Sequence, residues 1–101
     1  MPHGENQLMR HLTIFGRVQG VGFRWALSAQ PRALGLGGWV RNRRNGSVEA
    51  LVSGPPDAVE ALSEWARHGP PGAQVEGVMS NDPDGDAQGE PGSGFSQRAT
   101  L

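Results

Sequence analysis

The sequence predicts an α+β fold with the element order strand, helix, strand, strand, helix, strand. Two observations carry this prediction. Strand-like apolar runs and helix-like patterns follow one another along the chain, and an Asn-Gly pair joins the two central strand candidates. This order is that of the split β-α-β, ferredoxin-like sandwich, in which two helices cover one face of an antiparallel or mixed sheet. With 101 residues, the chain is expected to form a single domain over residues 1–101.

The first third of the chain is predicted to supply a strand and a helix. The apolar run Leu8–Phe15 is expected to form the strand, and Trp25–Leu34 the helix, which ends at a series of glycines. Pro31 lies inside this helix, where it removes the hydrogen bond to the carbonyl of Leu27. We therefore expect the helix to kink, or to break near Gln30 and restart at the proline.

A β-hairpin is predicted next. Trp39–Arg44 and Ser47–Ser53 have strand composition, and the Asn45-Gly46 pair between them is typical of a two-residue type I′ turn. In this register Asn42 faces Glu49, and it shares a sheet face with Val40 and Leu51. The opposite face is then expected to carry Trp39, Val48, Ala50 and Val52.

The second helix is expected to start at Pro56 or Asp57 and to run to about His68. Its apolar stripe follows the i, i+4, i+7 pattern and consists of Ala58, Leu62 and Trp65. Together with the other two tryptophans, Trp65 is expected to pack in the core or at its edge.

Two strands and two irregular segments account for the remainder. Ala73–Met79 alternates in polarity and is predicted to be the fourth strand, and Phe95–Leu101 is compatible with a short fifth strand. The acidic segment 81–94, which contains several glycines and prolines, is expected to be a mobile loop. The polar residues 1–7 are expected to be a flexible N-terminus.

Composition narrows the functional class. The net charge of −1 lacks the basic surplus of a nucleic-acid-binding protein. The absence of cysteine excludes thiol nucleophiles and Cys-ligated zinc, and the histidines have no metal-ligand spacing. No apolar run approaches the ~20 residues of a membrane span, and residues 1–7 do not resemble a signal peptide. We expect a cytoplasmic protein without a metal or cofactor and without nucleic-acid or membrane partners.

The most informative segment is the loop Gly16–Arg24, with the sequence GRVQGVGFR. It combines three glycines and two arginines with no acid, between a predicted strand and a predicted helix. Such a loop can point several backbone N–H groups at one anion, which the helix dipole also favours. Arg24 can add a bidentate contact to phosphate oxygens. The alternative interpretation is a tight turn that requires glycine for its backbone alone.

Two segments together resemble the acylphosphatase family. The loop Gly16–Arg24 resembles its phosphate-binding signature, and Gly38–Glu49, with the sequence GWVRNRRNGSVE, resembles its second signature. The family consists of small soluble enzymes that hydrolyse the carboxyl–phosphate bond of acyl phosphates without a metal. The resemblance implies a monomer that uses no cofactor, takes an acyl phosphate as substrate, and releases orthophosphate, which is expected to act as a competitive inhibitor.

The resemblance also implies a role for each site residue. Arg24 and the backbone amides of the loop would bind the phosphoryl group, and Asn42 would orient the attacking water. The amides are those of Val18, Gln19, Gly20, Val21, Gly22 and Phe23. The alternatives are an exposed arginine at a helix start and a polar strand residue near a turn. At the level of function, the alternative is a non-catalytic phosphate- or carbamoyl-phosphate-binding domain on the same fold. The chain departs from the family at Gln97, a position that is commonly apolar, which weakens the case for a buried last strand.

Overall fold

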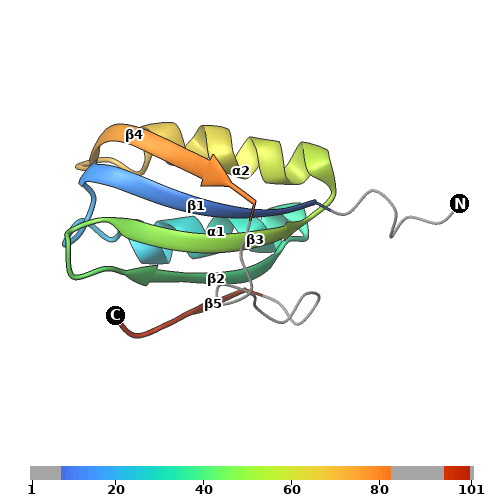
Figure 1. Cartoon of the computed structure of the whole chain (residues 1–101), viewed down its shortest axis with the longest axis horizontal. Coiled ribbons are helices and arrows are strands. Elements are labelled where there is room, and N and C mark those ends of the chain that lie inside the picture. Colours follow the sequence, from blue (N-terminus) through green and yellow to red (C-terminus); the bar gives the residue numbers. More distant parts are fainter. Residues whose placement is uncertain (1–7, 83–94, 101) are drawn as a thin grey trace, which may run out of the picture.

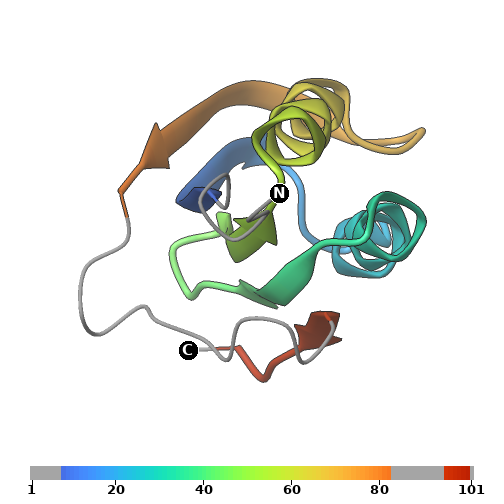
Figure 2. The same cartoon turned by 90° about the vertical axis from the view of Figure 1, so that its right-hand side faces the viewer.

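A computed structural model of the chain describes residues 8–82 and 95–100. The described elements form a mixed sheet with two helices on one of its faces (Figure 1, Figure 2). Their order and bounds are β1 (Leu8–Arg17), α1 (Phe23–Leu34), β2 (Gly37–Asn42), β3 (Val48–Gly54), α2 (Pro56–His68), β4 (Gln74–Asn81) and β5 (Phe95–Gln97). The predicted ferredoxin-like α+β fold is confirmed. The expected flexible N-terminus and most of the expected mobile loop lie outside the described residues.

The strand order across the sheet is β4-β1-β3-β2-β5. β1 lies between β3 and β4 and pairs antiparallel with both, and β2 pairs antiparallel with β3. β5 pairs parallel with β2 at the far edge of the sheet. The short fifth strand therefore exists, although it covers only Phe95–Gln97 of the expected segment. Its position brings residues from the end of the chain beside the strand that carries Asn42.

The core lies between the sheet and the two helices. The sheet contributes Leu12 and Ile14 from β1 and three alternating residues from β3, all of them fully buried. On α2 the buried residues are Val59, Leu62 and Ala66. The predicted stripe on this helix is therefore displaced by part of a turn, and Ala58 and Trp65 lie at its margin, partly buried against the core.

The helix α1 differs from its prediction in where it starts and in its continuity past Gln30. It begins at Phe23 rather than at Trp25, and it continues through residue 31 to Leu34 without interruption. The expected break near Gln30 is therefore wrong. Phe23 and Leu27 are fully buried against the sheet. A helix held by tertiary packing of one face tolerates the loss of a single backbone hydrogen bond.

The hairpin turn is longer than expected. The backbone N–H of Gly46 donates to the carbonyl of Arg43 at 3.1 Å, and the N–H of Arg43 donates to the carbonyl of Ser47 at 2.9 Å. Gly46 has φ 94°, whereas Asn45 does not have a positive φ. These features define a type I turn followed by a glycine bulge, not a type I′ turn, which needs positive φ at both central residues. Asn45 instead accepts hydrogen bonds from Ser47 through its side-chain oxygen.

The longer turn shifts the register of the hairpin by one residue. Asn42 pairs with Val48, and Arg41 pairs with Glu49. Paired residues point to the same face, and a one-residue shift moves side chains to the other face. Asn42 therefore shares the helix-covered face with Val48, whereas Trp39 lies on the opposite face. The expected pairing of Asn42 with Glu49, and the expected grouping of Trp39 with Val48, are wrong.

The three tryptophans have different environments. Trp39 is 2% exposed, and the guanidinium groups of Arg41 and Arg98 lie over its ring, 4.6 and 5.0 Å from the centroid. Trp65 contacts Phe23 edge-to-face, with ring centroids 5.6 Å apart. Trp25 is 74% exposed, so the expectation that it packs in the core or at its edge is wrong.

Candidate active site

A pocket of about 140 Å³ lies where the β1–α1 loop, the start of α1, the end of β2 and β5 meet. Its lining contains every residue that the sequence assigned to the site except Val21. The lining residues are Val18, Gln19, Gly20, Gly22, Phe23, Arg24, Trp25, Asn42 and Gln97. Residues separated by more than seventy positions in the sequence are therefore brought to one concave surface.

The glycine loop, residues 18–22, connects β1 to α1 and forms one wall of the pocket. Gly20 and Gly22 have φ values of 77° and 76°, and no neighbouring atom lies within 4 Å of the position that a Cβ would take. Glycine is favoured here by backbone conformation rather than by crowding. Within the described part of the chain, the N–H groups of residues 19–22 donate no hydrogen bond to another residue. Together with the start of α1, they are available to an anion.

Both ends of the glycine loop are anchored in the core. Val18 and Phe23 are each 1% exposed, and Phe23 contacts Trp65 on α2. Their side chains point into the protein interior, so their contribution to a ligand in the pocket is confined to the backbone. Val21 also packs against the core and does not line the pocket.

The side chain of Gln19 connects the glycine loop to the hairpin turn. Its Nε2 donates to the carbonyl oxygen of Arg43 at 2.6 Å and to that of Ser47 at 2.9 Å. Arg43 directly follows Asn42, so this side chain couples the two segments that were predicted to form the site. The sequence indicated only a backbone contribution from Gln19, because no local pattern reveals a contact to a turn 24 residues away.

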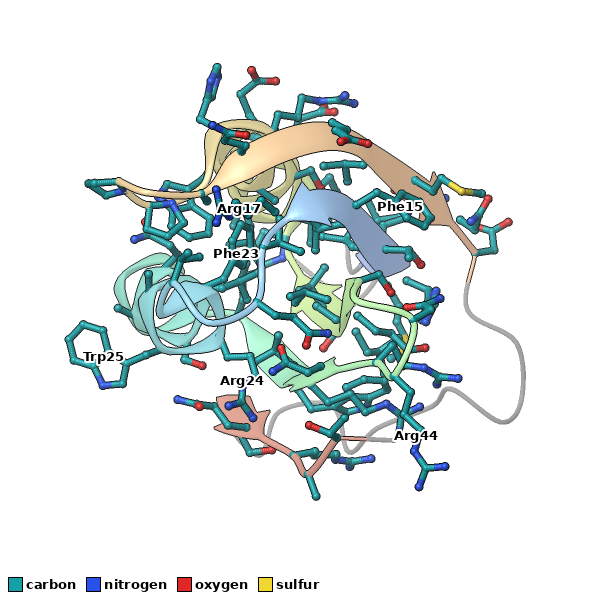
Figure 3. All side chains as sticks on the ribbon, turned by 90° about the vertical axis from the view of Figure 1, so that its left-hand side faces the viewer. Phe15, Arg17, Phe23, Arg24, Trp25 and Arg44 are labelled. Atoms are coloured by element: carbon teal, nitrogen blue, oxygen red, sulfur yellow. The ribbon has the colours of Figure 1, made fainter. Side chains whose placement is uncertain are left out.

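Arg24 and Asn42 approach the pocket from different elements. Arg24 lies in the first turn of α1 and extends toward β5 (Figure 3). Asn42 is the last residue of β2, on the helix-covered face. Both side chains are half-buried and line the pocket, and the carbonyl of Arg24 accepts a hydrogen bond from the Ser28 hydroxyl at 2.7 Å.

Gln97 and Trp25 are the two pocket residues that sequence reasoning missed, and Gln97 comes from the most distant part of the chain. It is the last residue of β5, pairs with Val40, and lines the pocket beside Arg24 and Asn42. The one feature of the sequence that could have revealed Gln97 was its polar side chain at a position that is commonly apolar in the family. That signal indicated a poorly buried strand, whereas the structure places the exposed glutamine at the rim of the site.

The other arginines near the two signature segments do not line the pocket. Arg44 is exposed and points into solvent at the end of the hairpin (Figure 3). Arg41 and Arg43 bind Glu49 on the sheet face opposite the helices. Trp25 contributes to the rim of the pocket, but its indole projects away from the sheet (Figure 3).

The Glu49 cluster, made of Glu49, His11, Arg41 and Arg43, is the main charged group on that opposite face. Oε1 of Glu49 accepts from Nε of Arg41 at 2.7 Å and from Nη1 of Arg43 at 3.1 Å, and Oε2 lies 2.5 Å from Nε2 of His11. Burial raises the pKa of the Glu49 carboxyl, but hydrogen bonds from Arg41, His11 and Arg43 and the charge of Arg41 together outweigh it, so the pKa lies below its ordinary value.

Among the described residues, no three His, Cys, Asp or Glu side chains are placed to hold a metal ion together. Neither α1 nor α2, the helices of the described ranges, is long and apolar enough to cross a membrane.

The fold and the site define a small α+β domain with a pocket at the junction of a strand, a glycine loop and a helix. The family model described as "Acylphosphatase" matches residues 10–96. A curated acylphosphatase from Acidovorax sp. is 48% identical over 102 residues, and the match covers 100% of both chains. The solved structure of an acylphosphatase from Coxiella burnetii superposes with a TM-score of 0.86 at 34% identity, covering 97% of this chain and 99% of the other.

The chain therefore belongs to the acylphosphatase family, and it is a hydrolase of acyl phosphates. A second kind of relative is a domain within a much longer protein. The structure of HypF from T. kodakarensis superposes with a TM-score of 0.75 at 27% identity, covering 88% of this chain but 11% of that chain.

Proposed function

We propose that the glycine loop and Arg24 hold the phosphoryl group of an acyl phosphate, and that Asn42 positions the water that attacks it. The observation that carries this proposal is that Arg24 and Asn42, on different elements, line the same pocket as the glycine loop. Acyl phosphate hydrolysis follows from family membership, and the division of roles among these residues is our inference.

The negative charge of the substrate explains why the glycine loop and Arg24 are suited to bind it. The phosphoryl group carries close to two negative charges, and its transition state is loose, with charge on the equatorial oxygens and the departing carboxylate. The protein must therefore position the group and stabilise charge. Backbone N–H groups of residues 18–23 and the planar guanidinium of Arg24 are suited to this, since the guanidinium stays charged and contacts two oxygens together.

The leaving group accounts for the role of Asn42. Its side-chain carbonyl accepts a hydrogen bond from a water and so directs the water oxygen toward phosphorus. The water oxygen bonds to phosphorus as the bond from phosphorus to the acyl oxygen breaks, which releases a carboxylate and orthophosphate. Because a carboxylate is a good leaving group, a strong general base is unnecessary and no metal is required for the step.

The test is hydrolysis of benzoyl phosphate in the presence of excess chelator. We expect the wild-type chain to turn over, and Arg24→Ala and Asn42→Ala each to lose on the order of 10²-fold in kcat/KM. Arg44→Ala and Asn81→Ala are matched controls, since both residues are exposed and outside the pocket. Loss of wild-type turnover in chelator would exclude the metal-independent mechanism.

The alternative raised by the sequence is a non-catalytic phosphate- or carbamoyl-phosphate-binding domain on the same fold. It predicts phosphate binding without turnover in the same assay. We further propose that the protein acts as a cytoplasmic monomer, and analytical ultracentrifugation with and without orthophosphate tests the oligomeric part of this proposal.

A further inference from the structure

Glu49 contacts the two residues that flank Asn42 in the sequence. A single carboxylate oxygen, Oε1, accepts hydrogen bonds from Nε of Arg41 at 2.7 Å and from Nη1 of Arg43 at 3.1 Å. Arg41 is also the residue directly opposite Glu49 in the β2–β3 ladder. Glu49 therefore joins residues 41 and 43 through one atom, while Asn42 lies between them.

The contact is made from the face that Asn42 does not use. Side chains alternate along a strand, so Arg41 and Arg43 point away from the helices whereas Asn42 points toward the layer in which α1 begins. β2 ends at Asn42, and just beyond it the backbone of Arg43 is hydrogen-bonded to Ser47 and Gly46 in the turn and accepts from the Gln19 side chain. The ionic contact of Arg43 with Glu49 adds a side-chain contact on the opposite face at this point, directly after Asn42.

The environment makes the contact of Glu49 with Arg41 stronger than a surface ion pair. Glu49 is 8% exposed and the side chain of Arg41 is 17% exposed, whereas the side chain of Arg43 is more open, at 38%. Charge-assisted hydrogen bonds in such partly dry surroundings are less screened than those at an open surface. Removing the carboxylate would leave two guanidinium groups without their common partner, and the strand end would relax to separate them.

We propose that Glu49 is a positioning residue that fixes the orientation of Asn42 through Arg41 and Arg43. This inference rests on the proposed role of Asn42 in presenting water. Glu49 does not touch the pocket, so its effect falls on the chemical step rather than on binding of the phosphoryl group. The glycine loop stays in place without it, because Val18 and Phe23 anchor that loop in the core.

The experiment compares Glu49→Ala and Glu49→Gln with His11→Ala in benzoyl phosphate hydrolysis. His11→Ala is the matched control, since it removes the other contact to the same carboxylate and leaves both arginine contacts. We expect Glu49→Ala to lower kcat about tenfold with KM and the orthophosphate inhibition constant nearly unchanged. Glu49→Gln, which keeps an acceptor oxygen, should recover part of the rate, and His11→Ala should keep the wild-type kcat.

The double variant Asn42→Ala/Glu49→Ala separates positioning from a general structural effect. If Glu49 acts through Asn42, the loss caused by Glu49→Ala largely disappears when Asn42 is already absent. A wild-type kcat in Glu49→Ala, or an undiminished loss in the Asn42→Ala background, would overturn the proposal. If circular dichroism shows that Glu49→Ala does not fold, Arg43→Met is measured in the same way. It must then show a lower kcat with a nearly unchanged KM.

NMR of the Asn42 side chain tests the positioning role of Glu49 separately from the proposed function, because it does not depend on turnover. The side-chain amide resonances of Asn42, assigned by their loss in Asn42→Ala, should shift in Glu49→Ala and stay in place in His11→Ala. Unshifted resonances in Glu49→Ala would refute positioning even in an active enzyme. An inactive wild type whose Asn42 resonances do shift would instead refute the proposed function and leave the positioning contact standing.

Discussion

Gln19 and Arg43 join the glycine loop to the hairpin through a side chain-to-backbone hydrogen bond, in which Gln19 Nε2 donates to the Arg43 carbonyl at 2.6 Å. A second donation from the same nitrogen reaches the carbonyl of Ser47 at 2.9 Å. The glycine loop, which leads into the helix that carries Arg24, is therefore connected to the hairpin that carries Asn42 by the uncharged side chain of a loop residue.

Replacing Gln19 by alanine should loosen this connection. Both carbonyls keep a backbone partner, because Gly46 donates to Arg43 and Arg43 donates to Ser47. The free energy of unfolding should therefore fall by only about 1–2 kcal/mol, measured by urea denaturation. The loss of kcat/KM should exceed that of Gln74→Ala, an exposed glutamine on the edge strand β4. Equal activity in both variants would show that the connection is dispensable.

Gly22→Ala should strain the glycine loop. Gly22 has φ 76°, a conformation that an alanine adopts at a cost of about 1–2 kcal/mol, although the space for a methyl group is open. We expect lower stability and weaker protection by orthophosphate in thermal denaturation. Gly77→Ala is the matched control, since Gly77 also has open space at its Cβ position but no positive φ. If the two variants have equal melting temperatures, backbone conformation is not what requires glycine in the loop.

Orthophosphate should stabilise the folded chain, because an anion held by the glycine loop binds the native state only. At a concentration of about 100 times its Kd, the expected gain is about 2.7 kcal/mol in the free energy of unfolding. Differential scanning calorimetry of the wild type and Arg24→Ala tests this, with sulfate and chloride as anion controls. A melting temperature that does not respond to orthophosphate in the wild type would count against an anion site.

Acid should destabilise the protein through Glu49. The pKa of its carboxyl is 4.5 in an unfolded reference and lower in the folded protein, so the unfolded chain binds protons first as pH falls. The stability that Glu49 contributes is present above pH 4.5 and is lost as pH falls further, through the lower pKa of the folded state. Urea denaturation at pH 7 and at a series of values below 5 should show this loss in the wild type and a smaller one in Glu49→Gln. Parallel curves for the two proteins would contradict the prediction.

The sequence by itself determined the order of the elements and pointed to the two segments that line the candidate pocket. Strand and helix patterns depend on neighbouring residues, so their periodicity is visible in the chain, and both α2 and the strands were located to within a few residues. The glycine loop and Arg24 were recognisable for the same reason. Their glycines, basic residues and position before a helix are all local features.

Only the tertiary structure decided how these parts meet. The hairpin register depended on whether Asn45 takes the left-handed conformation as Gly46 does, and one residue of difference moved Asn42 from pairing with Glu49 to pairing with Val48. The side-chain connection made by Gln19 and the position of Gln97 at the pocket link residues that are distant in sequence. Such contacts arise from the packing of the sheet edge and loops against one another, and no local pattern in the chain encodes them.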